Sequence, residues 1–115
     1  MSDPKISAFV ISYNRAAILA TCLRALCFAD ELIVVDKSST DDSRLIAARY
    51  AHRVVTVPWT PTVEETRALA QSLCRHDWIL FMDDDECLSP EAARLIRTEI
   101  RHPRADIYAL SLIHI

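Results

Sequence analysis

Four consecutive acidic residues, Asp83-Asp84-Asp85-Glu86, directly follow the apolar run WILFM at residues 78–82. Their carboxylates repel one another, and this repulsion is costly beside a buried strand end. A divalent cation such as Mg²⁺ or Mn²⁺ would relieve it, because these ions prefer oxygen ligands and keep positions open for substrate phosphates. In a backbone that stays extended, Asp83 and Asp85 point the same way, so this pair is expected to face the metal. The alternative is a solvated acidic loop before a helix.

Three other side chains are candidates for contact with a phosphorylated ligand. Asp36 ends a second apolar run and could accept hydrogen bonds from a base or ribose, or simply stabilise its loop. Arg67 falls in a predicted helix, where a cation could meet a phosphate, although a lone helical arginine is more often solvated. Trp59 could shape a pocket, but we expect an ordinary packing anchor.

The histidines and cysteines do not form a catalytic or zinc-binding pattern. The four histidines lie apart in the sequence, and none has a nucleophile beside it. The four cysteines include no Cys-x-x-Cys pair, which argues against zinc. We expect them to be small buried hydrophobic residues, kept reduced in the cytosol. They are Cys22, Cys27, Cys74 and Cys87.

The composition argues against several classes of protein function. The chain has 115 residues, enough for one domain, and a net charge of −3, which argues against a nucleic-acid-binding protein. Glycine is absent, so the glycine-rich phosphate loops of the Walker and dinucleotide-binding types are excluded. No apolar run approaches the roughly 18 residues of a membrane span. We expect a cytoplasmic protein, with any contact to the inner face of the membrane made through regions outside this chain.

The pattern along the chain alternates strand and helix. Buried strands are predicted at residues 6–12, 32–35, 53–57 and 77–82, with a fifth beginning at 106–110. Helices are predicted at 15–27, from the polar loop 38–42 to 50, at 62–74 and at 89–101. Asn14 is the expected N-cap of the first helix and Ser89 that of the last, with Pro90 at N1. This alternation predicts an α/β three-layer sandwich with a mainly parallel sheet covered on both faces.

The predicted sheet determines where a ligand should bind. Ligands of parallel sheets bind beyond the carboxyl ends of the strands. Three polar segments follow strands directly, at residues 12–15, 36–41 and 83–86. The acidic run is therefore expected to share one edge of the sheet with Asp36 and with the segment after the first strand.

Three stretches together resemble a known family: ISAFVISYNRAAILATCLRAL, ADELIVVDKSSTDDS and ILFMDDDECLSPEA. They are similar to the nucleotide-binding half of inverting family 2 glycosyltransferases of the GT-A fold. The nearest group is the bacterial one that extends lipopolysaccharide cores. The resemblance covers about residues 5–100, and the order and spacing of the motifs carry it. The family's Gly-Ser-Thr loop appears as Ser38-Ser39-Thr40, and its frequent second acid after Asp36 is replaced by Lys37.

The resemblance implies roles for individual residues. Ser12 and Tyr13 match residues that flank the nucleotide base, Asp36 matches an acid that contacts base or ribose, and Arg67 matches a basic helix residue near the donor. Asp83 and Asp85 match the Asp-x-Asp motif, with Asp85 the stronger candidate for direct metal ligation. The nucleotide-sugar site implied in this way comprises Ser12, Tyr13, Asn14, Asp36, Arg67, Asp83 and Asp84, and the metal ligands are Asp83 and Asp85.

The reaction implied is single displacement at the anomeric carbon of a nucleotide-sugar, with UDP as the expected nucleotide. An acceptor hydroxyl on a glycan or a lipid-linked glycan attacks, and nucleoside diphosphate leaves. Mn²⁺ or Mg²⁺ would stabilise the charge that develops on the diphosphate. The family's general base lies well downstream of the Asp-x-Asp motif, and no residue of this chain matches it.

Two alternatives stay open. The chain could bind nucleotide and metal without catalysing transfer, as a fragment without acceptor site or base. A Mg²⁺-dependent phosphotransfer domain is a weaker option, since it would carry its acids after the first strand. The chain ends inside a predicted strand, and residues 110–115 (LSLIHI) resemble a translated transposon-end adapter. We therefore expect the native protein to continue past about Ala109, with this tail non-native. The alternative is a natural short chain whose apolar tail completes the fifth strand.

Overall fold

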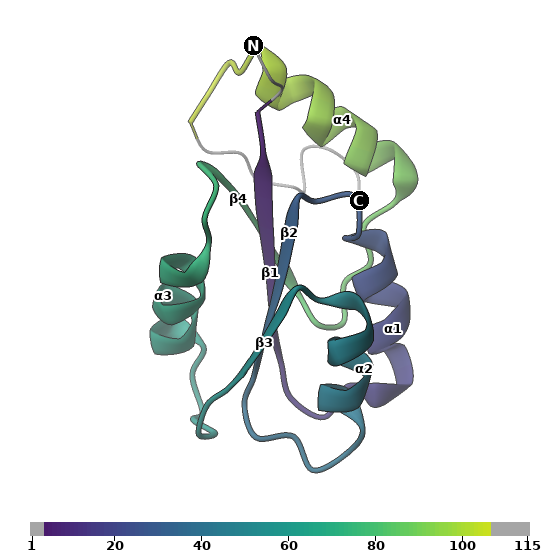
Figure 1. Ribbon diagram of the computed structural model, residues 1–115, viewed down its shortest axis with the longest axis vertical. Helices are drawn as coiled ribbons and strands as arrows, with labels where there is room; N and C mark the ends of the chain where they lie inside the picture. Colours follow the sequence, from purple (N-terminus) through teal and green to yellow (C-terminus); the bar gives the residue numbers. More distant parts are fainter. Residues whose placement is uncertain (1–3, 107–115) are drawn as a thin grey trace.

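The computed structural model describes residues 4–106, in which strands and helices alternate from end to end (Figure 1). The strands are β1 (Ile6–Ser12), β2 (Glu31–Asp36), β3 (Arg53–Thr56) and β4 (Trp78–Asp83). The helices are α1 (Ala16–Ala25), α2 (Ser43–Tyr50), α3 (Glu64–Leu73) and α4 (Pro90–Arg101). Every predicted element within this range is present, with boundaries shifted by a few residues at most.

The four strands form one parallel sheet in the order β3-β2-β1-β4. Ser12 is in register with Asp36, and Ile11 is in register with Asp83. The carboxyl ends of β1, β2 and β4 therefore lie side by side, as the sequence predicts.

Helices cover both faces of the sheet, which confirms the three-layer α/β architecture (Figure 1). Helices α1, α2 and α4 pack on one face around a core that includes Val10, Leu23 and Ile96. Helix α3 packs on the other face, where Phe9 and Phe81 stack with ring centroids 4.9 Å apart. The central strands β1 and β2 are buried throughout because each is covered on both sides, whereas β3 is only half-buried at the edge.

Of the two predicted helix N-caps, one is present in the structure and the other is not. Ser89 caps α4 as predicted, and its Oγ accepts a 3.0 Å hydrogen bond from the N–H of Ala92. Asn14 does not cap α1, because its backbone takes a positive φ of 50° and Arg15 occupies the cap position. Asp41, from the loop before α2, instead accepts a 3.1 Å hydrogen bond from the N–H of Ala16. A tertiary contact has replaced the local cap that the sequence indicates.

Two predictions fall partly or wholly beyond the described range. The fifth strand, predicted to begin at residues 106–110, and the tail at 110–115 lie outside it, apart from Asp106. Among the helices of residues 4–106, none combines the length and the apolar character needed to cross a membrane.

Candidate functional site

The acidic turn, residues 83–86, is tied to the end of β1 through Asp84. The Oδ2 of Asp84 accepts a 3.1 Å hydrogen bond from the N–H of Tyr13, and its Oδ1 accepts one of 3.3 Å from the Nε of Arg15. The Nη2 of Arg15 also lies 3.8 Å from the Oδ2 of Asp85. Burial raises the pKa of Asp84, although the Tyr13 N–H and the Arg15 guanidinium act in the opposite direction. Arg15 thus partly offsets the repulsion among the carboxylates.

The backbone of the acidic turn differs from the expectation. The strand ends at Asp83, and Asp84 and Asp85 form a turn, closed by a 3.1 Å hydrogen bond from the N–H of Glu86 to the carbonyl of Asp83. The extended-backbone argument that paired Asp83 with Asp85 therefore does not apply. The side chain of Glu86 folds back, and its Oε1 accepts a 3.2 Å hydrogen bond from the N–H of Asp83.

The donor set of the acidic turn fits a hard divalent cation. Asp83 and Asp85 are both exposed and offer carboxylate oxygens, the ligands that Mg²⁺ and Mn²⁺ prefer. Over residues 4–106 no cluster of three or more His, Cys, Asp or Glu side chains is arranged to hold a metal ion. Two carboxylates alone would leave coordination positions for water and phosphate oxygens, which is the usual mode for these ions beside a nucleotide.

Asp36 stabilises the loop that follows it. Its side chain is almost fully buried, and its carboxylate accepts hydrogen bonds from the N–H (2.8 Å) and the Oγ (2.6 Å) of Ser39. The Nε of Arg44 lies 3.9 Å from the same carboxylate. These contacts match the loop-stabilising alternative, and a contact between Asp36 and a nucleotide stays a prediction.

Asn14 joins the end of β1 to the loop after β2. Its Oδ1 accepts hydrogen bonds from the N–H groups of Thr40 (2.7 Å) and Asp41 (3.3 Å), and its own N–H donates to the Oγ of Ser39 at 2.9 Å. With the Tyr13–Asp84 contact, this brings together all three polar segments that the sequence places at this edge. The expected convergence of the segments is confirmed.

Lys37 and Trp59 lie close together, and Trp59 is placed differently from the expectation. The ammonium group of Lys37 is buried and donates to the backbone carbonyls of Thr60 and Thr62, the latter at 2.7 Å. It also lies 5.8 Å from the ring centroid of Trp59. Trp59 is 54% exposed, so the prediction of a packing anchor is wrong, and its ring lies 6.1 Å from that of Tyr13.

Arg67 and Ser12 each carry a buried polar atom with no hydrogen-bond partner in the part of the chain that the structure describes. The guanidinium of Arg67 lies over the ring of Phe81, 4.6 Å from its centroid, on the α3 side of the sheet. Within residues 4–106 the Nε of Arg67 and the Oγ of Ser12 are buried and make no hydrogen bond. Arg67 makes no ion pair with the acidic turn in this range.

Two cysteines meet beside the acidic turn. The Sγ of Cys22, on α1, lies 2.7 Å from the Sγ of Cys87, which follows Glu86. Burial, the contact with Cys87 and the nearby charges of Asp84 and Asp85 raise the pKa of Cys22 to about 12. Cys87 and Cys27 are exposed, so the prediction of buried small residues is wrong for these two.

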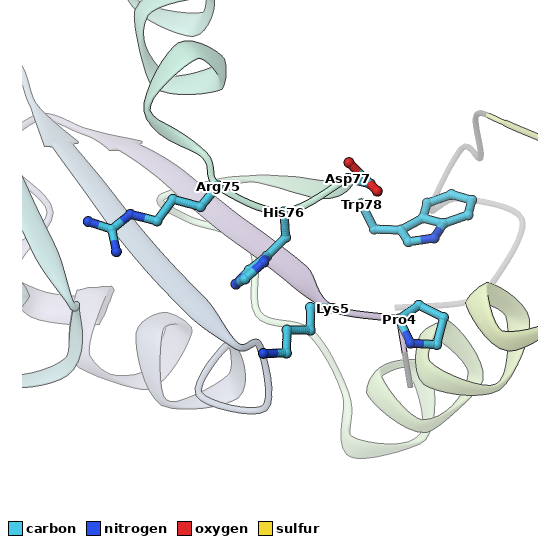
Figure 2. A pocket seen from close by; sticks show the side chains of 6 residues that line it. All are labelled: Pro4, Lys5, Arg75, His76, Asp77 and Trp78. Atoms are coloured by element: carbon cyan, nitrogen blue, oxygen red, sulfur yellow. The ribbon is translucent and has the colours of Figure 1, made fainter. Parts of the chain in front are cut away.

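A separate pocket of about 270 Å³ lies at the opposite end of the strands, where β1 and β4 begin (Figure 2). It is lined by Pro4, Lys5, Arg75, His76, Asp77 and Trp78. These residues lie at the amino ends of β1 and β4, whereas the acidic turn lies at the carboxyl end of β4. The pocket is therefore distinct from the candidate site.

The sequence did not reveal which residues hold the loops together at the carboxyl ends of the strands. Arg15 pairs with the acidic turn, Asp41 holds the start of α1, and Lys37 holds the segment around Trp59. The available signal was position alone, since each of the three lies in or beside a polar segment that follows a strand.

Sequence comparison places these features in a family context. The family model described as Glycosyl transferase family 2 matches residues 7–115. An uncharacterized glycosyltransferase of Rickettsia felis is 46% identical over 88 residues, covering 76% of this chain and 31% of the relative. The lipopolysaccharide core biosynthesis glycosyltransferase LpsC of Rhizobium meliloti is 28% identical over 96 residues, covering 79% of this chain and 35% of LpsC. The chain thus spans about a third of the length of these relatives.

Solved structures show the same fold. Glucosyl-3-phosphoglycerate synthase from Mycobacterium tuberculosis, in complex with Mn²⁺, UDP and glucosyl-3-phosphoglycerate, superposes with a TM-score of 0.68 at 26% identity. The match covers 88% of this chain and 41% of the synthase. TarS from S. aureus gives a TM-score of 0.73 at 23% identity, covering 84% of this chain and 32% of the TarS 1–349 chain, and supports the fold alone.

Proposed function

This chain belongs to glycosyl transferase family 2, and on that premise we propose that it forms the donor-binding part of an inverting nucleotide-sugar glycosyltransferase. The observation that carries the proposal is the contact of Asp84 with Tyr13 and Arg15. It fastens the acidic turn beside the end of β1, at the sheet edge where ligands of parallel sheets bind. A diphosphate bound there would lie between metal-binding carboxylates and the segment that follows β1.

We propose that Asp83 and Asp85 hold Mn²⁺ or Mg²⁺. Both side chains are exposed at the strand end and supply hard oxygen ligands. The structures of the mycobacterial synthase with UDP and either Mn²⁺ or Mg²⁺ support this assignment. When bound, the metal would act as a Lewis acid that stabilises the leaving diphosphate. Asp84 positions the turn and stays bonded to Arg15.

The nucleotide would lie along the end of the sheet, near Tyr13 and Trp59. Both rings are substantially exposed and lie 6.1 Å apart, so they offer apolar surface to a base. Lys37 holds the segment that carries Trp59, and the buried Asp36 holds the neighbouring loop. Among residues 4–106, Ser12 and Arg67 each carry a buried polar atom that makes no hydrogen bond, which supports a further contact with ligand. UDP is the expected nucleotide, in line with the mycobacterial synthase.

The acceptor is proposed to be a glycan or lipid-linked glycan of the lipopolysaccharide type. The likeness to LpsC supports this class. In an inverting reaction the acceptor hydroxyl attacks the anomeric carbon on the face opposite the diphosphate. A general base must remove the proton of that hydroxyl.

Calorimetric titration of UDP into the protein tests donor binding. With Mn²⁺ present we expect saturable binding that EDTA abolishes and that Asp83→Asn and Asp85→Asn each weaken at least tenfold. Asp77→Asn is the matched control, because this exposed acid lies at the other edge of the sheet. Equally tight binding in EDTA would refute the metal assignment. Binding that neither Asp83→Asn nor Asp85→Asn weakens would refute it as well.

Release of nucleoside diphosphate in the presence of a glycan acceptor distinguishes transfer from donor binding alone. The proposal predicts acceptor-dependent release by a protein that includes the whole transferase. Mn²⁺-dependent UDP binding without any acceptor-dependent release would favour the second candidate, a nucleotide- and metal-binding module.

A further inference from the structure

The Cys22–Cys87 pair joins two parts of the molecule that are far apart in sequence. Their Sγ atoms lie 2.7 Å apart although the two residues are 65 positions apart in the sequence. A disulfide bond has an S–S length of about 2.0 Å, so closing the bond needs a movement of only about 0.7 Å. Both residues are free thiols in the structure. The two sulfur atoms are thus close enough for an oxidant to join them in a disulfide.

The two thiols differ in access. Cys87 is exposed in the loop directly after the acidic turn, whereas Cys22 is buried on the inner face of α1. An oxidant in solution therefore reaches Cys87 first, and Cys22 is the thiol that can complete the bond. The other two cysteines, Cys27 and Cys74, lie just after α1 and α3, and each donates from Sγ to a backbone carbonyl of the preceding helix.

We propose that Cys22 and Cys87 form a thiol–disulfide site that reversibly fastens the acidic turn to α1. The oxidant is a small-molecule disulfide of the glutathione class. The Cys87 thiolate attacks one sulfur of glutathione disulfide, forming a mixed disulfide and releasing one glutathione thiolate. The Cys22 thiol then loses its proton and its sulfur attacks the Cys87 sulfur. The bond between Cys87 and glutathione breaks, and the second glutathione leaves as thiolate. The two leaving thiolates take up the two protons that the Cys87 and Cys22 thiols lose. Two electrons pass from the protein to the oxidant, and excess thiol reverses both steps.

The link would restrain the segment that carries the acidic turn. Cys87 is adjacent to Glu86 in sequence, and Asp84 already contacts Arg15 at the start of α1. A covalent bond to Cys22 adds a second attachment of the same segment to the same helix. The proposal concerns the mobility of the turn, and it stands whether or not the turn binds a metal.

Peptide mapping of the full chain tests the bond itself. After incubation with glutathione disulfide and blocking of free thiols, mass spectrometry should find peptides containing Cys22 and Cys87 linked and lighter by two hydrogens. Dithiothreitol should separate them. The link should form in Cys27→Ser and Cys74→Ser and be absent in Cys87→Ser, which changes an exposed side chain and should fold. Stable glutathione on Cys87 without the link, or a link that involves Cys27 or Cys74, would overturn the proposal.

Hydrogen exchange tests the restraint. We expect the backbone amides of residues 83–88 to exchange at least threefold more slowly in the oxidised protein than in the reduced one. Oxidant should leave exchange unchanged in Cys87→Ser. Equal exchange in the linked and reduced wild-type proteins would show that the bond does not restrain the turn.

Discussion

The backbone N–H of Tyr13 donates a 3.1 Å hydrogen bond to the carboxylate of Asp84, a residue 71 positions later in the chain. This contact links the segment after β1 to the turn after β4. Because the two strands are hydrogen-bonded neighbours in the sheet, both segments emerge at the same edge. Asp84 therefore has a positioning role, which combines this hydrogen bond with its ion pair to Arg15.

Substitution of Asp84 separates its hydrogen-bonding role from its charge. Asp84→Ala removes the acceptor for Tyr13 and Arg15, and we expect it to lower the free energy of unfolding by about 1 kcal/mol. Asp84→Asn keeps an acceptor oxygen for the N–H of Tyr13 and loses the acceptor for the Nε of Arg15. It also removes a charge that burial disfavours, so its stability should stay within about 0.5 kcal/mol of wild type. Urea denaturation at neutral pH measures both values. Equal losses in the two variants would contradict the positioning role.

Asn14 combines a positive φ of 50° with an Oδ1 that accepts hydrogen bonds from the loop after β2. Asn14→Ala loses the acceptor and adds the steric penalty of the left-handed region, so we expect a loss of about 2–3 kcal/mol. Asn14→Gly loses the acceptor but adopts this φ freely, and its loss should be smaller by about 1 kcal/mol. Thermal or urea unfolding of both variants gives the comparison. A glycine variant that is less stable than the alanine variant would show that backbone strain is not important here.

Much of the fold was predictable from local sequence. Apolar runs such as IVV in β2 and the Ser89-Pro90 start of α4 identify their elements directly, because burial and capping are local properties. Because strands and helices alternate, the strands are expected to run parallel. The polar segments after β1, β2 and β4 then lie at the same end of the sheet. The choice of carboxylates as candidate metal ligands follows from the same reasoning.

The details of the site depend on contacts that sequence spacing does not encode. Asn14 was predicted as a helix cap from its position, but its side chain bonds to residues 40 and 41. Trp59 was predicted to be an ordinary packing anchor, whereas it is exposed beside Tyr13. The turn at Asp84 and Asp85 replaced the extended backbone on which the side-chain alternation relied. In each case a long-range contact or a chain reversal overrode a local preference.

Lys37 is expected to hold the segment that carries Trp59. Lys37→Met keeps much of the buried stem but leaves the carbonyls of Thr60 and Thr62 without their charged donor. We expect a loss of stability on the order of 2 kcal/mol. We also expect greater quenching of Trp59 fluorescence by acrylamide, measured in a Trp78→Phe background so that one tryptophan reports.

The exposed Lys5 supplies the control for this experiment, because Lys5→Met removes the same charge at the other edge of the sheet. Its stability and its Trp59 quenching should match those of the background protein. If Lys37→Met also matched the background in both measurements, the two carbonyl contacts would not hold the Trp59 segment.

The ionised side chain of Asp30 makes the stability of the fold depend on pH in the acidic range. Its Oδ2 accepts hydrogen bonds from the Nη1 of Arg97 (3.0 Å) and from the N–H of Ile6 (2.8 Å), which joins α4 to the start of β1. The Arg97 hydrogen bond, followed by that of Ile6, lowers the pKa of Asp30 below its ordinary value of 3.8. Between the lowered and the ordinary pKa, the unfolded chain binds more protons than the folded one, so stability falls as pH falls.

The contribution of Asp30 is therefore fully present above about pH 4 and is lost as pH drops through the lowered pKa. Asp30→Asn should be less stable than wild type at pH 7, and the gap between the two should narrow steadily from about pH 4 downward. Urea denaturation at a series of pH values measures the gap, with Asp77→Asn as the exposed control. A gap that stays constant down to the acid transition would mean that Asp30 gains nothing from its charge, and the hydrogen bond to Arg97 would then act as a neutral contact.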